Sequence, residues 1–189
     1  MEIKERKIKG VFEIALNPLG DHRGFFMRTY DNEIFKKNGL DRFWVQENHS
    51  SSSRKGVVRG LHFQLPPFSE TKMVRCISGA ILDVFVDLRE GSDTFGEWDS
   101  IELSAENKKM IYIPRGFAHG FCTLTEHSEV VYKVDNFYNP ENERGLLWND
   151  PEIGIAWPVS DNEVILSDKD KKNLTLNEFK QDYHSIKIT

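Results

Sequence analysis

Short runs in which apolar and polar residues alternate make up most of this chain. The clearest run spans residues 80–88, where Leu82, Val84, Val86 and Leu88 share one face of a predicted strand. Clusters of turn-forming residues separate such runs, as turns between strands do. The pattern predicts strands at residues 11–16, 24–30, 57–64, 73–77, 80–88, 100–103, 109–113, 121–124 and 129–134.

Helical patterns are few. Residues 31–38 begin with acidic side chains and end with lysines before Gly39, which suits the helix dipole and a C-terminal cap. Residues 174–183 predict a second helix. Residues 138–157, dense in Pro, Gly, Trp and Asn, predict an ordered loop, pinned by aromatic side chains, that covers the mouth of the fold. The whole pattern predicts an all-β fold, an antiparallel jelly roll or β-barrel with a few short peripheral helices.

Bulk composition is that of an ordinary globular protein. At 189 residues, the chain is expected to form a single domain over residues 1–189. The net charge of −5 provides no cationic field to attract nucleic acid, and no apolar run is long enough to cross a membrane. Cys76 and Cys122 lie in apolar runs without CxxC spacing, and the N-terminus lacks the apolar core of a signal peptide. We therefore expect a cytoplasmic protein with buried thiols, which binds neither nucleic acid nor membrane.

Two histidines, His62 and His119, each interrupt an apolar, β-prone stretch that contains glycine. A buried imidazole costs about 1–3 kcal/mol unless a partner hydrogen-bonds it. Either histidine alone is more simply explained as a satisfied core residue. Two of them in similar surroundings indicate a shared interior site.

An interior site needs a few polar groups among apolar walls. Candidates for such groups are Arg23, Arg59, His62, Gln64, Lys72, Asp83, His119, Tyr132, Asp168 and Asp170. Arg59 and His62 are three residues apart, so a regular strand would send them to opposite faces. Both can reach one cavity only if Gly60 forms a bulge or a sharp bend.

Residues 114–119 are similar to the second motif of the cupin barrels, which often hold iron, manganese or zinc. The first cupin motif would need a His-x-His pair, whereas His62 is followed by Phe63 and Gln64, and no glutamate follows at the usual short spacing. Two histidines without a carboxylate make a poor divalent site, and the ammonium of Lys72 would repel a cation. We therefore expect no metal.

The remaining chemistry is acid–base. Histidine titrates near neutral pH, so His62 can accept a proton, and a carboxylate on its other ring nitrogen would fix the tautomer. Tyr132 shares a strand face with Val130 and Val134, and is either a core tyrosine or a proton donor. Lys72 is either a solvated strand end or the cation that neutralises an oxyanion. Arg23 is either a turn residue or a guanidinium that binds phosphate.

Motifs spread between about residues 12 and 170 are specific in combination. They are Asp21-x-Arg23-Gly24-x-Phe26, Gln46-Glu47-Asn48-x-Ser50, Arg59-Gly60-Leu61-His62-Phe63-Gln64, Gly79-x-x-x-Asp83-Val84-x-Val86-Asp87-x-Arg89, Ile113-Pro114-x-Gly116-Phe117-Ala118-His119-Gly120-Phe121, Leu147-Trp148-Asn149-Asp150, Gly154-Ile155-x-Trp157-Pro158 and Leu166-Ser167-Asp168-Lys169-Asp170. Together they closely resemble the dTDP-4-dehydrorhamnose 3,5-epimerases, the cofactor-independent sugar-nucleotide epimerases of rhamnose biosynthesis.

This resemblance implies a metal-free, cupin-like jelly roll that forms a homodimer, binds a nucleotide sugar and needs no cofactor. It implies His62 as the base, Asp170 rather than Asp168 as its carboxylate partner, Tyr132 as the acid on the opposite face, and Lys72 near the C4 oxygen of the substrate. It also implies a set of sugar-nucleotide contacts, from Arg23, Gln46, Asn48, Arg59, His119, Tyr138, Glu143 and Lys169.

The implied reaction converts dTDP-4-dehydro-6-deoxy-D-glucose into dTDP-4-dehydro-L-rhamnose. A ketone at C4 acidifies the C–H bonds at C3 and C5, so a base on one face can remove a proton and an acid on the other face can return one. Positioned acid and base each contribute about 10²–10⁴-fold. A cation beside the enolate oxygen adds a further few kcal/mol.

One departure bears on the substrate. The family commonly shows Arg-Gly-x-Phe-x-Glu, and Arg28 stands in the last position here, which is a charge reversal beside a nucleotide-binding segment. Alternatives are a mono-epimerase on a related nucleotide-linked 4-keto-6-deoxysugar and a 3,4-ketoisomerase, which would move the ketone instead of inverting a centre. A non-catalytic sugar-nucleotide binding module and a metal-dependent cupin oxygenase are the more distant alternatives.

Overall fold

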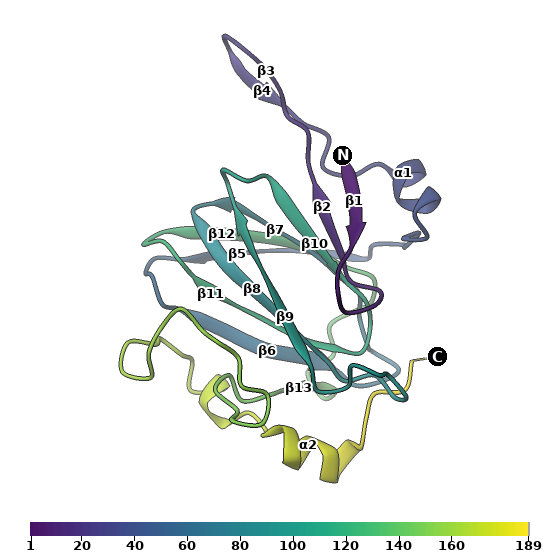
Figure 1. Ribbon diagram of the computed structural model, residues 1–189, viewed down its shortest axis with the longest axis vertical. Coiled ribbons are helices and arrows are strands. Elements are labelled where there is room, and N and C mark those ends of the chain that lie inside the picture. Colours follow the sequence, from purple (N-terminus) through teal and green to yellow (C-terminus); the bar gives the residue numbers. More distant parts are fainter. Residues whose placement is uncertain (189) are drawn as a thin grey trace.

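Two antiparallel sheets face each other in the computed structural model, which describes residues 1–188 (Figure 1). The six-stranded sheet has the order β1 (Glu2–Glu5), β2 (Phe12–Ala15), β10 (Lys109–Ile113), β7 (Lys72–Ser78), β12 (Ser128–Val134) and β5 (Gln46–Ser52). The five-stranded sheet has the order β13 (Glu143–Gly145), β6 (Val58–Gln64), β11 (Phe117–Thr123), β8 (Ala80–Asp87) and β9 (Trp98–Ser104). The predicted antiparallel, all-β jelly roll is confirmed.

The main apolar core fills the space between the two sheets. Val74, Ile111 and Val130 of the six-stranded sheet meet Phe85 and Phe121 of the five-stranded sheet there. The alternation of β8 is confirmed, but its uniformly apolar face does not point into this space. Residues such as Val84 and Val86 instead belong to a second core on the outer face of the five-stranded sheet. Both faces of β8 are therefore covered.

Two short helices cover the outer faces of the sheets, as Figure 1 shows. Helix α1 (Asn32–Lys37) is capped by the side chain of Asp31, and it buries Phe35 against the six-stranded sheet. Helix α2 (Leu176–Tyr183) begins with a capping box between Thr175 and Glu178. It lies on the outer face of the five-stranded sheet, where its residues join the second core. Both predicted helices are confirmed within two residues at each end.

A hairpin of β3 (Leu19–Asp21) and β4 (Gly24–Phe26) projects away from the sandwich (Figure 1). The predicted strand at residues 24–30 is wrong beyond residue 26, because the chain leaves the hairpin there and approaches α1. Leu19, Phe25 and Phe26 are all exposed on the hairpin. An isolated two-stranded hairpin with exposed apolar side chains has no core of its own to bury them.

The segment 138–157 is ordered by aromatic side chains, as predicted. The indole Nε1 of Trp157 donates to the Trp148 carbonyl at 2.6 Å, and the two rings lie 6.2 Å apart. The prediction that this segment covers the mouth of the fold is wrong for most of its length. Its apolar residues, such as Leu146 and Ile153, are part of the second core, on the outer face of the five-stranded sheet.

Both cysteines are buried and unpaired, as the apolar runs around them predict. Burial raises the pKa of the Cys122 thiol to about 11 and also raises that of Cys76. Among residues 1–188, the structure contains no helix with both the length and the apolar character that a membrane crossing requires.

Candidate active site

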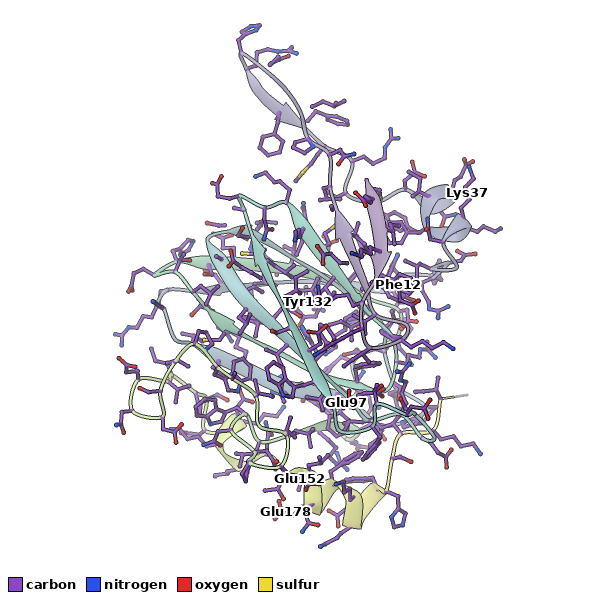
Figure 2. All side chains as sticks on the ribbon, in the orientation of Figure 1. Phe12, Lys37, Glu97, Tyr132, Glu152 and Glu178 are labelled. Carbon is purple, nitrogen blue, oxygen red and sulfur yellow. The ribbon has the colours of Figure 1, made fainter. Side chains whose placement is uncertain are left out.

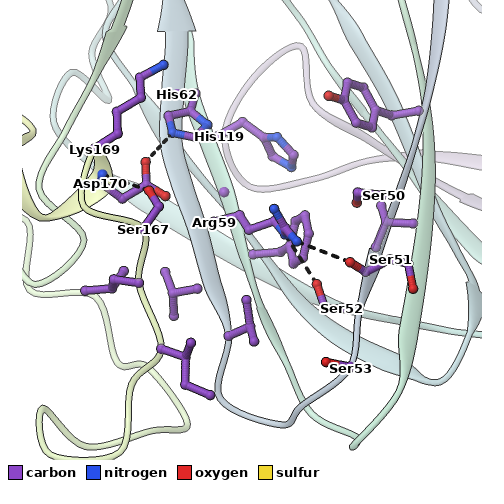
Figure 3. Close-up of a pocket in the computed structure, with 18 of the residues that line it drawn as sticks. Ser50, Ser51, Ser52, Ser53, Arg59, His62, His119, Ser167, Lys169 and Asp170 are labelled. Carbon is purple, nitrogen blue, oxygen red and sulfur yellow. Dashed lines mark hydrogen bonds and ion pairs between the residues drawn. The ribbon is translucent and has the colours of Figure 1, made fainter.

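A cavity of about 560 Å³ opens between the two sheets (Figure 3). Strand β6 contributes His62 and Arg59, and β11 contributes His119. The opposite wall is formed by Lys72 of β7 and Tyr132 of β12. The volume lies within the range of small-molecule sites, which is roughly 300–1,000 Å³.

A histidine–carboxylate pair joins the five-stranded sheet to the C-terminal segment. The Nε2 of His62 lies 2.6 Å from the Oδ1 of Asp170, the first residue of the 3₁₀ turn η1 (Asp170–Lys172) (Figure 3). Burial acts to raise the pKa of the Asp170 carboxyl. The hydrogen bond and charge of His62, with donors from Ser167 and the Gly60 backbone, outweigh burial, so this pKa lies below its ordinary value.

The ionised Asp170 determines the tautomer of His62. A carboxylate only accepts hydrogen bonds, so Nε2 of His62 carries the hydrogen and Nδ1 keeps a free lone pair. This is the arrangement of an imidazole that can accept a proton at Nδ1 and share the resulting charge with a carboxylate.

Replacement of Asp170 is expected to affect both activity and stability. Asp170→Asn should lower turnover by up to about 10⁴-fold, since the amide no longer fixes the His62 tautomer. Because the pKa of the Asp170 carboxyl is lowered by folding, its stabilisation is present at neutral pH and is lost as the pH falls through the folded value. The stability gap between wild type and Asp170→Asn, measured by urea unfolding, should therefore shrink as the pH falls below about 4.

Asp168→Asn is the matched control, because Asp168 is 93% exposed and pairs with Lys171. It should leave turnover and its pH dependence unchanged. Equal losses in the two variants would contradict a specific role for the His62–Asp170 pair.

Gly60 forms the bulge that brings Arg59 and His62 to one cavity. His119 of β11 is opposite His62 and Phe121 is opposite Arg59, so β6 carries one extra residue between these pairs. Gly60 has φ of +120°, which L side chains rarely adopt. The predicted bulge is confirmed.

The space beside Gly60 leaves no room for a side chain. A Cβ there would lie 2.7 Å from the Cα of Gly120 and 2.7 Å from the His119 carbonyl oxygen. Gly60→Ala is expected to destabilise the fold by about 2–4 kcal/mol. Gly91→Ala is the control, with φ of +69° and open space, and should cost about 1 kcal/mol. Urea unfolding measures both, and equal costs would contradict the steric argument.

Tyr132 lies on the wall opposite His62. It occupies β12 beside Val130, on the face that meets the main core, and it also lines the cavity. Figure 2 shows Tyr132 among the strands of the sandwich, while Lys37 and Glu178 lie on the peripheral helices. A base from one sheet and a phenol from the other thus border the same space.

A second histidine–carboxylate pair lies deeper in the cavity. The Nε2 of His119 is 2.9 Å from Oδ2 of Asp83, and Asp83 is completely buried. Burial raises the pKa of the Asp83 carboxyl, although the nearby His119 and Lys72 act against that rise. Its Oδ1 is buried without a partner among the described residues. His119 faces the cavity, so this pair presents a fixed imidazole to a ligand.

Arg59 reaches across the cavity toward β5, where it contacts a row of serines (Figure 3). Its Nε donates to Ser52 Oγ at 3.3 Å, and its NH2 group donates to the Ser51 carbonyl at 3.2 Å. Both partners are neutral, and Arg59 makes no ion pair with a carboxylate among residues 1–188. Such a group suits an anionic part of a ligand.

A chain of polar contacts is linked to the cavity through Lys169, which lines it. The Tyr138 hydroxyl donates to Glu143 at 2.7 Å, and the Lys169 ammonium pairs with the same carboxylate. Burial acts to raise the pKa of Glu143, but Lys169 and Tyr138 lower it more. Gln46 of β5 accepts a hydrogen bond from the Tyr138 backbone at 2.8 Å. Asn48 is opposite Tyr132 in the β5–β12 pair, so both side chains share a face of the sheet.

Arg23 is a predicted site residue that the structure does not bring to the cavity, and Gln46, Asn48, Tyr138 and Glu143 are not among the residues that line it either. Arg23 lies in the two-residue turn at the tip of the β3–β4 hairpin, its side chain is 78% exposed, and its partner is the neighbouring Asp21. Arg28, at the departure from the family motif, pairs with Asp31 at 3.3 Å and also lies outside the cavity. Within a single chain, Arg23 is therefore a turn residue, which is one of the two interpretations that the sequence offered.

Several residues that line the cavity were assigned no role from the sequence. They come from β5 and the loop after it, and from the segment before Asp170. They are Ser50, Ser51, Ser52, Ser53, Ile165, Leu166 and Ser167. The motifs that contain Ser50 and Ser167 were the available signal. Within the part of the chain that the structure describes, no three His, Cys, Asp or Glu side chains converge as metal ligands would.

A family model described as dTDP-4-dehydrorhamnose 3,5-epimerase matches residues 5–178. The chain belongs to the dTDP-4-dehydrorhamnose 3,5-epimerase family. A member from Shigella flexneri is 48% identical over 171 residues, which cover 90% of this chain and 93% of that protein.

Solved structures of related epimerases share the fold. One is a dTDP-6-deoxy-D-glucose-3,5-epimerase from Legionella pneumophila, solved in complex with dTDP-4-keto-L-rhamnose; it is 36% identical, has a TM-score of 0.92, and covers 100% of this chain and 98% of its own. Another is ChmJ, a 3′-monoepimerase from Streptomyces bikiniensis in complex with dTDP-quinovose; it is 34% identical, has a TM-score of 0.87, and covers 93% of this chain and 88% of its own. The fold alone therefore does not distinguish single from double epimerisation.

Proposed function

We propose that this member of the family epimerises dTDP-4-dehydro-6-deoxy-D-glucose at C3 and C5, giving dTDP-4-dehydro-L-rhamnose for dTDP-L-rhamnose biosynthesis. The observation that carries this proposal is the placement of His62, with Asp170, and Tyr132 on opposite walls of one cavity. Inversion of a carbon needs proton removal from one face and proton return on the other, so two groups on opposite walls suit this chemistry.

In the proposed mechanism, the C4 ketone of the sugar acidifies the neighbouring C–H bonds. Nδ1 of His62 removes a proton, and the electron pair moves onto the C4 oxygen as an enolate. Lys72 places an ammonium on the cavity wall, where it would stabilise that oxygen. Tyr132 then gives its proton to the opposite face of the same carbon, which inverts the centre. No electron leaves or enters the substrate, so the reaction needs no redox cofactor.

The nucleotide diphosphate would bind along the cationic side of the cavity. Arg59 and Lys169 both line it, and a guanidinium matches the geometry of phosphate oxygens. We assign His119, Gln46, Asn48, Tyr138 and Glu143 to the walls around the sugar and the nucleotide. The free thiols of Cys76 and Cys122 support a cytoplasmic location, where disulfides are rare.

The exposed hairpin supports a homodimer in which Arg23 acts on the partner. Leu19 is 72% exposed and Phe26 is 67% exposed on a hairpin that has left the body of its own chain. Apolar exposure of this kind marks a contact surface. In a two-fold dimer, each hairpin would cover the same surface of the other copy. Arg23 would thereby join the cationic groups of the partner's cavity.

Mixed dimers test this arrangement. Arg23→Ala and His62→Ala homodimers should each lose turnover, because every site lacks one group. In a dimer of one Arg23→Ala chain and one His62→Ala chain, one site regains both groups and the other loses both, so about half of the wild-type activity should return. Differently tagged chains, purified as the mixed dimer, give the measurement. No recovery above the two homodimers would contradict action of Arg23 in the partner's site.

Product analysis tests the proposed function. The purified, chelator-treated protein should convert dTDP-4-dehydro-6-deoxy-D-glucose so that a 4-keto reductase with NADPH then yields dTDP-L-rhamnose. NMR assignment of the product ketone separates the alternatives, since a 3,4-ketoisomerase would move it from C4 to C3. An unchanged substrate would favour a binding module, or a different nucleotide sugar.

A further inference from the structure

Gln64 closes the conspicuous motif of β6, yet the proposed chemistry does not use it. Its side chain is buried at the end of the strand. Its Nε2 lies 3.0 Å from the Phe68 carbonyl, 3.0 Å from Oε2 of Glu70 and 3.2 Å from the Phe137 carbonyl. Its Oε1 accepts a hydrogen bond from the Asn139 backbone at 2.6 Å. Gln64 thus ties together the segments around one end of the cavity.

The segment between β6 and β7 is held at several further points. The Ser69 hydroxyl donates to the Gln64 carbonyl at 2.9 Å, and Asn136 donates to the Ser69 carbonyl at 3.2 Å. The Thr71 backbone N–H donates to Asp135 at 2.6 Å. Glu70 lies between these anchored residues with its side chain only 12% exposed. Its carboxylate is therefore fixed in place before any ligand binds.

The fixed carboxylate lies against Lys72. Oε1 of Glu70 is 3.2 Å from the Nζ of Lys72, and this is the ion pair that the lysine makes within residues 1–188. A lysine side chain has a flexible four-carbon stem and carries about 2 kcal/mol of rotamer entropy. Without an anchor, its ammonium would occupy many positions in a cavity of this size. The charge of Lys72 also acts to lower the pKa of the Asp83 carboxyl, on the opposite sheet, against the rise that burial causes.

We propose that Glu70 is the positioning residue of Lys72: Gln64 holds its carboxylate through Oε2, and Oε1 fixes the ammonium where the enolate oxygen forms. This inference rests on the proposed function, because it gives Lys72 a reacting oxygen to stabilise. One of the three ammonium hydrogens is directed to Glu70, which leaves two for the substrate. Preorganised donors of this kind cost no reorganisation at the moment of reaction.

The role requires an oxygen at that position rather than a negative charge, because an oxygen lone pair is what accepts the ammonium hydrogen. The Nε2 of Gln64 has two hydrogens and three acceptors, so it can release Glu70 without leaving a hydrogen unpaired. A glutamine at position 70 could therefore keep its carbonyl oxygen on Lys72. A methionine has nearly the same length and offers no such oxygen.

The test compares Glu70→Met with Glu70→Gln. Glu70→Met should lower kcat about 10- to 100-fold through misplacement of Lys72, with KM and the Kd for dTDP near the wild-type values. Glu70→Gln should retain most of the wild-type kcat. Glu152→Met is the control, since Glu152 pairs with Lys180 on the surface and should be silent. Wild-type kcat in Glu70→Met, or an equal loss in Glu70→Gln, would overturn the proposal.

A second background separates this role from a structural one. In Lys72→Met, the further change Glu70→Met should have no additional effect on deuterium exchange at C3 or C5, because Glu70 acts only through Lys72. An additional loss there would overturn the proposal. Wild-type protein that exchanges no proton at all would instead refute the proposed function.

Discussion

His62→Ala is expected to abolish proton exchange at the substrate carbons. The variant removes the base, and a positioned base contributes about 10²–10⁴-fold to the rate. It also leaves Asp170 buried without the ring that accounts for its lowered pKa. Deuterium incorporation from D₂O, followed by NMR, should fall to background, while binding of dTDP persists because the cationic groups remain.

His49→Ala is the matched control for this experiment. His49 is an exposed histidine that also pairs with a carboxylate, that of Glu129 at 2.8 Å. Its loss should leave exchange unchanged. Wild-type exchange in His62→Ala would contradict the assignment of the base, and would transfer that role to another group such as His119.

Tyr132→Phe is expected to separate exchange from epimerisation. The variant keeps the base, so a proton can still leave and the enolate can form. Without the phenol, the enolate takes a proton back from His62 on the original face, and the centre is not inverted. Net epimerisation should fall about 10²-fold or more, while deuterium still enters at the carbon that faces His62.

Tyr183→Phe provides the control. Tyr183 lies on helix α2, outside the cavity, and its hydroxyl accepts a hydrogen bond from Arg144 of β13. The variant should leave both exchange and inversion intact. Normal epimerisation by Tyr132→Phe would mean that a water molecule or another side chain returns the proton.

Much of the fold followed from the hydrophobic pattern. The pattern placed the start of β11, at Phe117, four residues too late, and the strands that it missed entirely are polar or very short. The strand β5 has the sequence QENHSSS, with no apolar residue, so periodicity could not detect it. Its strand conformation comes from backbone pairing with β12 over seven residue pairs, from Gln46 to Ser52. The missed strands β1, β3 and β13 have only three or four residues each. Such strands form because a neighbour supplies the hydrogen bonds, which local sequence does not reveal.

The site could be predicted in part. The conflict between Arg59 and His62 on a regular strand pointed to a bulge, and the register of β6 against β11 contains one. The partnership of His62 with Asp170 joins residues 108 positions apart, and no local pattern could supply it. That pairing came from the resemblance of the whole chain to a family. Neither the local pattern nor the resemblance to the family could predict that Arg23 lies on a projecting hairpin. Both concern the type of residue at a position, and neither gives its distance from the cavity.

Position-resolved deuterium incorporation by the wild-type protein would decide whether both centres are epimerised. The chelator-treated protein would be incubated with dTDP-4-dehydro-6-deoxy-D-glucose in D₂O, and each sugar carbon would be observed by NMR. We expect deuterium at both C3 and C5, with both centres inverted. Deuterium at one carbon only would contradict double epimerisation and make the protein a mono-epimerase. Absence of deuterium from both would contradict acid–base epimerisation of this sugar at the His62–Tyr132 cavity.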